Sequence, residues 1–153
     1  MALYLVQHGK ALAKAEDPEK GLSPEGIGDV ERIAGVARGY GVTVGRIRHS
    51  GTKRSRMTAE LVAAQLTPAG GVDGADGLAP LDAVEPWAER LDPADDLMVV
   101  GHLPFLERLA SLLVMGFTDR PVFKLQNGGI LCLDRDAGEE HWYIKWGLMP
   151  EVG

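Results

Sequence analysis

The first nine residues of the chain, MALYLVQHG (residues 1–9), place a histidine directly after a short apolar run. The run Ala2–Gln7 is typical of a β-strand that is buried on both faces, because nearly all of its side chains are apolar. A second segment, LMVVGHLP (residues 97–104), repeats the arrangement with His102. In open α/β sheets, ligands bind outside the carboxyl ends of the strands. We therefore expect His8 and His102 to meet at one edge of a sheet and to share a site.

The composition of the 153-residue chain is that of a globular protein, with 45% hydrophobic and 25% charged residues. This length predicts a single domain over residues 1–153. The net charge of −6 argues against binding to nucleic acid, which favours a basic surface. The only cysteine, Cys132, excludes an internal disulfide and a zinc cluster built from cysteines. We expect a cytoplasmic protein without a membrane partner, because no apolar run reaches the roughly 20 residues of a membrane span and no signal peptide is visible.

Apolar periodicity predicts strands that alternate with helices in the first two thirds of the chain. The predicted strands are Ala2–Gln7, Val44–Ser50 and Leu97–Gly101, and the predicted helices are one from Ser23-Pro24 to Gly39, Thr52–Leu66, Val84–Leu91 and Pro104–Met115. Loops are expected at Lys10–Leu22 and Gly70–Gly77. Three later strands, Phe123–Gln126, Ile130–Asp134 and Trp142–Leu148, are separated only by turn signals, which favours antiparallel pairing. The expected fold is a three-layer α/β/α fold with a mixed, mainly parallel sheet and antiparallel strands at the C-terminus.

Cationic side chains follow the second predicted strand in the segment SGTKRSR (residues 50–56), where a helix begins. The N-terminus of a helix favours anions, and an arginine can bind two phosphate oxygens at once. Histidine is a nucleophile in covalent catalysis, and phosphoryl transfer depends mainly on positioning and charge stabilisation. His8, His102 and this cationic segment together therefore indicate phosphoryl-transfer chemistry. A metal site is disfavoured, because the two histidines show no recognisable ligand spacing.

This ordered set of motifs resembles the histidine phosphatase superfamily, which has the phosphoglycerate mutase-like fold. Within that superfamily, LSPEG (residues 22–26) and WGLMP (residues 146–150) are similar to the SixA-type phosphohistidine phosphatases. The resemblance extends over almost the whole chain. It implies an enzyme that removes phosphate from a phosphohistidine of a protein substrate, without a metal ion or another cofactor.

The resemblance also implies individual roles. His8 would be the nucleophile, Arg54 would bind the phosphate, and His102 would contact the phosphate and stabilise charge in the transition state. Gly9 would allow a close approach of the backbone. Gln7 stands where the family usually has an arginine, so it would donate a hydrogen bond without supplying charge.

Four further positions concern the charge that Gln7 does not supply and the identity of a general acid. Lys10 or Arg56 would compensate for the missing charge if either side chain points into the site. Asp82 is the first candidate for a general acid and Glu85 the second. A phosphohistidine substrate has little need of a strong acid, since an imidazole with an ordinary pKa of about 6.5 is protonated near neutral pH.

Two alternatives to a phosphohistidine phosphatase stay open at this point. One is a phosphomonoesterase that acts on small molecules. The other is a module that binds phosphohistidine or phosphate without catalysis, because Gln7 replaces the usual arginine. Of the remaining histidines, we expect His49 to have a structural role and His141 to face solvent.

Overall fold

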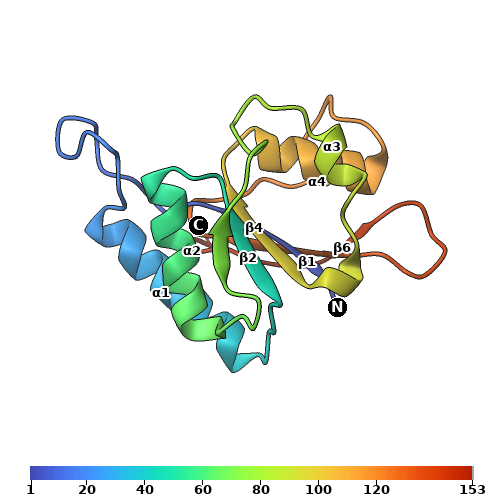
Figure 1. The fold of residues 1–153 in the computed structure, drawn as a ribbon, viewed down its shortest axis with the longest axis horizontal. Helices are drawn as coiled ribbons and strands as arrows, with labels where there is room; N and C mark the ends of the chain where they lie inside the picture. Colours follow the sequence, from blue (N-terminus) through green and yellow to red (C-terminus); the bar gives the residue numbers. More distant parts are fainter. Residues whose placement is uncertain (153) are drawn as a thin grey trace.

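The computed structural model describes residues 1–152, which include a six-stranded sheet with the order β3-β2-β4-β1-β5-β6 (Figure 1). The strands are β1 (Leu3–Gln7), β2 (Arg46–His49), β3 (Val72–Gly74), β4 (Leu97–Gly101), β5 (Ile130–Asp134) and β6 (Tyr143–Leu148). The first four are parallel, whereas β5 runs antiparallel to β1 and β6 antiparallel to β5. The predicted mixed sheet, with its antiparallel strands at the C-terminal end, is confirmed.

Helices cover both faces of the sheet, which gives the predicted three layers (Figure 1). α1 (Pro24–Gly39) and α2 (Lys53–Leu66) pack on one face. The short α3 (Glu85–Ala88) and α4 (Phe105–Met115) pack on the other, and a 3₁₀ turn, η1 (Pro93–Asp95), precedes β4.

The two helices on the first face start where the sequence predicts, because each begins with a hydroxyl cap. The side chain of Ser23 accepts a hydrogen bond from the backbone N–H of Gly26, and Pro24 follows at the first helical position. Thr52 accepts in the same way from Ser55 at the start of α2. Such caps satisfy backbone N–H groups that have no partner within the helix.

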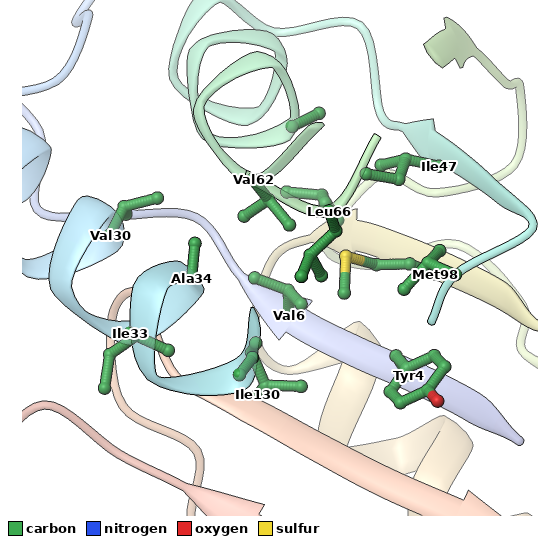
Figure 2. Close-up of a cluster of buried hydrophobic side chains, with 14 of the residues drawn as sticks. Tyr4, Val6, Val30, Ile33, Ala34, Ile47, Val62, Leu66, Met98 and Ile130 are labelled. Carbon is green, nitrogen blue, oxygen red and sulfur yellow. The ribbon is translucent and has the colours of Figure 1, made fainter. Parts of the chain in front are cut away.

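The core under α1 and α2 fixes the strands that lead to the site (Figure 2). Val30 of α1 and Val62 of α2 pack with Val6 of β1 and Met98 of β4, and all four side chains are buried. Burial of one such side chain contributes about 1.5–3 kcal/mol. The central strands β1 and β4 are therefore held firmly at the edge where they end.

Two predictions about the strands were wrong. β3 lies within Gly70–Gly77, which was expected to be a loop. Conversely, Phe123–Gln126 forms no strand. The backbone N–H of Leu125 donates to Glu107 Oε2, and that of nearby Val122 to Ser111 Oγ, so this segment is bonded to side chains of α4 rather than to a neighbouring strand.

Two smaller points concern the helices. The predicted helix over Val84–Leu91 is shorter in the structure and spans Glu85–Ala88. Within residues 1–152, no helix has the length and apolar character needed to cross a membrane.

Candidate active site

The site lies at the carboxyl edge of three adjacent strands. β4 lies between β2 and β1, and His8 follows β1, Ser50 follows β2, and His102 follows β4. The ring centroids of His8 and His102 are 5.1 Å apart, with the rings in an edge-to-face arrangement. The sheet order therefore brings together two histidines that are far apart in the sequence.

Four hydrogen bonds hold the two peptide units that flank the α-carbon of His8. The N–H of His8 donates to the carbonyl of Gly101, and the carbonyl of Gln7 accepts from the N–H of Gly128. The carbonyl of His8 accepts from Asn127 Nδ2 at 3.0 Å. The N–H of Gly9 donates to Thr58 Oγ1 at 3.0 Å. The backbone at His8 is thus fixed from β4, from α2 and from the turn before β5.

The imidazole of His8 makes a hydrogen bond to its own segment, with 2.8 Å between Nδ1 and the carbonyl oxygen of Gly9. A carbonyl only accepts, so this contact assigns the proton to Nδ1 and leaves the lone pair on Nε2. Burial lowers the pKa of His8, and the charges of Arg54 and Lys20 lower it further, while the bond to Gly9 acts in the opposite direction. His8 is therefore neutral at neutral pH, with the lone pair of Nε2 available.

His102 is buried, with 3% of its surface exposed, and its partners are hydroxyl groups. Its Nε2 lies 2.6 Å from Ser50 Oγ and 3.4 Å from Ser55 Oγ, and Ser50 Oγ lies 3.0 Å from Ser55 Oγ. Burial lowers the pKa of His102 to about 4, with further contributions from His8 and Arg54. Hydroxyls both donate and accept, so this pair can serve either protonation state of His102.

Arg54 is close enough to both histidines for its charge to lower the pKa of each. It is the second residue of α2 and is half-buried. Its carbonyl accepts a hydrogen bond from Thr58 Oγ1, the same hydroxyl that receives the N–H of Gly9. Thr58 thereby connects the helix of Arg54 to the loop of His8. An arginine at a helix N-terminus beside two neutral histidines is a combination that favours an anion over a cation.

Gln7 and Gly9 flank the first histidine in different ways. Gln7 is half-buried, and its Oε1 is buried without a hydrogen-bond partner among residues 1–152. A rotation of the amide by half a turn would put its NH₂ group there instead. At Gly9, an added Cβ would lie 2.9 Å from Val30 Cγ2. Glycine at this position therefore allows the loop to pack against α1.

The two cations considered as replacements for the missing arginine have other partners. Lys10 Nζ lies 2.7 Å from a carboxylate oxygen of Glu25 and 2.9 Å from one of Glu151, and these contacts raise its pKa. Arg56 is exposed and lies near Glu60, one turn along α2. Neither charge is directed at the histidines by these contacts.

The two acid candidates lie in the segment that leads to α3. Asp82 is half-buried, and its Oδ2 accepts a hydrogen bond from the N–H of Ala79 at 2.8 Å, which closes a local turn. Glu85 is exposed at the start of α3. The contacts that the structure gives these carboxylates are local, and none joins them to His8 or His102.

Several contributors to the site did not stand out in the sequence: Ser50, Ser55, Thr58 and Asn127. Hydroxyl residues at a helix start are ordinary caps, and Asn127-Gly128 is an ordinary turn signal. The one available signal was the density of Ser and Thr just after the strand that ends at His49. As expected, His141 is exposed, whereas His49 is buried and accepts a hydrogen bond from the N–H of Gly51.

A resident metal ion finds no ready site in the part of the chain that the structure describes. Residues 1–152 contain no group of three or more His, Cys, Asp or Glu side chains arranged to hold one. The two histidines face Arg54 and hydroxyl groups rather than carboxylates. This set of groups fits an anion better than a cation.

The architecture is similar to that of known phosphatase structures. The protein histidine phosphatase SixA in complex with tungstate aligns over 98% of this chain and 97% of its own, with a TM-score of 0.81 and 21% identity. The α-ribazole phosphatase of Shigella flexneri aligns over 100% and 98%, with a TM-score of 0.75 and 15% identity. No protein-family model matches the sequence. The fold is therefore the histidine phosphatase fold, as predicted.

A relative in sequence extends the comparison. An uncharacterized protein of Picosynechococcus sp. is 35% identical over 146 residues, which cover 90% of this chain and 87% of the relative. The chain belongs to the same protein family as this relative.

Proposed function

We propose that this protein is a phosphohistidine phosphatase, which hydrolyses phosphate from a histidine of a protein substrate through a covalent phospho-His8 intermediate. The observation that carries the proposal is the state of His8. Its Nδ1 is bonded to the Gly9 carbonyl, its lowered pKa keeps it neutral, and Arg54 and His102 stand beside it. These are the requirements of a nitrogen nucleophile in phosphoryl transfer.

In the first step, the lone pair of His8 Nε2 attacks phosphorus and a new P–N bond forms. The P–N bond to the substrate imidazole breaks, and the departing nitrogen keeps the electron pair and takes a proton from solvent. Arg54 neutralises charge on the phosphate oxygens. A substrate imidazole can be protonated near neutral pH, so this step needs no strong acid such as Asp82.

In the second step, a water oxygen attacks the same phosphorus and the bond to His8 Nε2 breaks. The water loses a proton to solvent, and inorganic phosphate leaves with His8 neutral again. His102 would contact the phosphate oxygens in both steps. A bound phosphate anion would raise the pKa of His102 above its value in the empty site, because opposite charge favours the protonated form.

The test is to phosphorylate the protein with phosphoramidate and to locate the phosphate by mass spectrometry at alkaline pH, where phosphohistidine persists. We expect a transient phosphate on His8 and release of inorganic phosphate on longer incubation. The variant His8→Ala should show neither. His141→Ala is the matched control, since His141 is an exposed histidine that lies next to Gly116 at the end of α4.

The same experiment contradicts the proposal if His8 is never labelled although the protein still binds phosphate. That outcome would favour the binding module. Binding should then depend on Arg54 and not on Arg56, which lies on the same helix but is exposed. In that case Gln7→Arg, which introduces the arginine usual in the resembling family, should restore labelling.

The similarity to an α-ribazole phosphatase supports a second candidate, a phosphomonoesterase for small molecules. An alkoxide leaving group needs a proton donor more than an imidazole does. Cleavage of a simple phosphate ester much faster than of a phosphohistidine protein would favour this function. It should then be slowed selectively by Asp82→Asn.

A further inference from the structure

The turn before β5 carries Asn127, whose side chain bonds the backbone of His8. The N–H of Gly129 donates to the carbonyl of Gln126 at 2.9 Å, and Gly128 has a φ of +80°. This is the pattern of a type II turn with glycine at its third position. The hydrogen bond of this turn joins Gln126 and Gly129. The side-chain amide of Asn127 extends instead to the loop of His8.

Asn127 is one of only two side chains among the four hydrogen-bond partners at His8. Its Nδ2 holds the carbonyl of His8, and Thr58 Oγ1 holds the N–H of Gly9. These two atoms are opposite ends of a single peptide unit, so together they fix its orientation. The remaining two partners, Gly101 and Gly128, are backbone groups.

The carbonyl of Gly9 belongs to the next peptide unit along the chain, so its direction depends in part on how the His8–Gly9 unit is held. This carbonyl accepts the proton of His8 Nδ1 at 2.8 Å, and a histidine has a free lone pair on only one ring nitrogen at a time. If the peptide unit rotates, the Gly9 carbonyl no longer selects the form of His8 with its lone pair on Nε2.

We propose that Asn127 is a positioning residue for the nucleophile, which holds the His8–Gly9 peptide unit so that His8 presents Nε2 to phosphorus. The role rests on the proposed function of His8. The hydrogen bond that the structure gives the Asn127 amide is to the His8 carbonyl and not to the reacting nitrogen or to Arg54. The residue acts through the backbone, and it does so from a turn more than a hundred residues away in the sequence.

The experiment compares Asn127→Ala and Asn127→Asp with the wild type. The aspartate has nearly the same shape but places a carboxylate oxygen against the His8 carbonyl, so it replaces attraction by repulsion. Gln126→Ala is the matched control, because Gln126 lies in the same turn but bonds the backbone of Glu151 instead of His8. Thermal melting identifies any variant that fails to fold.

The first measurement is independent of activity. Long-range nitrogen–proton NMR reports which ring nitrogen of a neutral histidine carries the proton, and the signals of His8 are assigned by their loss in His8→Ala. We expect the wild type and Gln126→Ala to carry the proton on Nδ1. In Asn127→Ala and Asn127→Asp, a substantial fraction should move to Nε2.

The second measurement is turnover of phosphoramidate together with binding of inorganic phosphate. Displacement of a reacting group by about 1 Å costs roughly a hundredfold in rate, so kcat should fall by about tenfold to a hundredfold in Asn127→Asp and less in Asn127→Ala. The Kd for phosphate should stay within about twofold, because Arg54 is untouched. Gln126→Ala should keep both values.

The outcomes separate this inference from the proposed function. If folded Asn127→Asp keeps the proton on Nδ1 and turns over normally, the positioning role of Asn127 is overturned. His8 would then still be the proposed nucleophile. A wild type without turnover would overturn the proposed phosphatase, whereas a shifted proton in the Asn127 variants would still establish that the turn controls His8.

Discussion

The two histidines of the site are held in opposite ways. His8 is half-buried and bonded to backbone carbonyl oxygen, whereas His102 is almost fully buried and bonded to the hydroxyls of Ser50 and Ser55. A carbonyl accepts only and so selects one form of the ring, while hydroxyls can serve either form. The difference indicates a division of labour. In the proposed phosphatase, His8 would be held in the form that attacks phosphorus, and His102 would change its protonation state as charge develops on the phosphate.

Of the expected effects that distinguish the two histidines, the largest is the loss of turnover when His102 is replaced. In His102→Gln, we expect kcat to fall by about a hundredfold to a thousandfold, the loss typical for one donor to a charged transition state. His8 should still become labelled, since its nucleophilic nitrogen is intact. Rapid-quench labelling with phosphoramidate measures this. A variant with wild-type turnover would show that His102 has no part in charge stabilisation.

The second effect is on stability in acid. The pKa of His102 is about 4 in the folded protein, below the ordinary value of about 6.5 in an unfolded chain. The unfolded state therefore binds more protons between these values, and the free energy of unfolding falls as the pH drops from about 6.5 to 4. The contribution of His102 is on the order of 3 kcal/mol over this range.

Urea denaturation of the wild type and His102→Gln at pH values across that range, in buffer without phosphate, measures this contribution. The lowered pKa values of His8 and His49 act in the same direction, but they are common to both proteins and cancel in the comparison. Equal loss of stability in the two proteins would contradict the low pKa of His102.

The smallest effect concerns the hydroxyl that touches His102. Ser50→Ala removes the contact at 2.6 Å and leaves Ser55 Oγ at 3.4 Å. We expect a loss of about 1 kcal/mol in the free energy of unfolding and a turnover several-fold lower. Ser111→Ala is the matched control, because Ser111 is a buried serine whose Oγ bonds the segment after α4 instead of a histidine. If both variants lose stability and neither loses turnover, Ser50 has only a structural role.

The strands that carry the site were predictable because strands buried on both faces consist of continuous apolar runs. Leu97–Gly101 is observed with the predicted boundaries, and β1 differs from Ala2–Gln7 by one residue. The prediction of a strand over Phe123–Gln126 was wrong because the apolar residues of this segment pack against α4. A segment buried against a helix has the same apolar pattern in the sequence as one buried in a sheet. β3 was missed because three residues are too few for a periodic signal.

The residues of the candidate site also fall into those that the sequence predicts and those that it does not. His8, His102 and Arg54 stand at predicted junctions between strands and helices, so their common location followed from the fold. The contacts from Asn127 and Ser50 did not follow, because they depend on which turn and which strand end lie side by side in three dimensions. The local turn that occupies Asp82 likewise depends on backbone geometry that its sequence context does not fix.

The strand order also determines when the site can form during synthesis of the chain. β1 is paired with β4 and β5, so this strand is synthesised before the six-stranded sheet can form and has to wait for partners encoded about a hundred residues later. At the usual rates of about 5–20 residues per second, that delay lasts about 5–20 seconds. Gln7 and His8 are thus the earliest residues of the site to be synthesised and among the last to be positioned. A nascent chain that ends before Asn127 lacks two of the four hydrogen bonds that hold the backbone at His8.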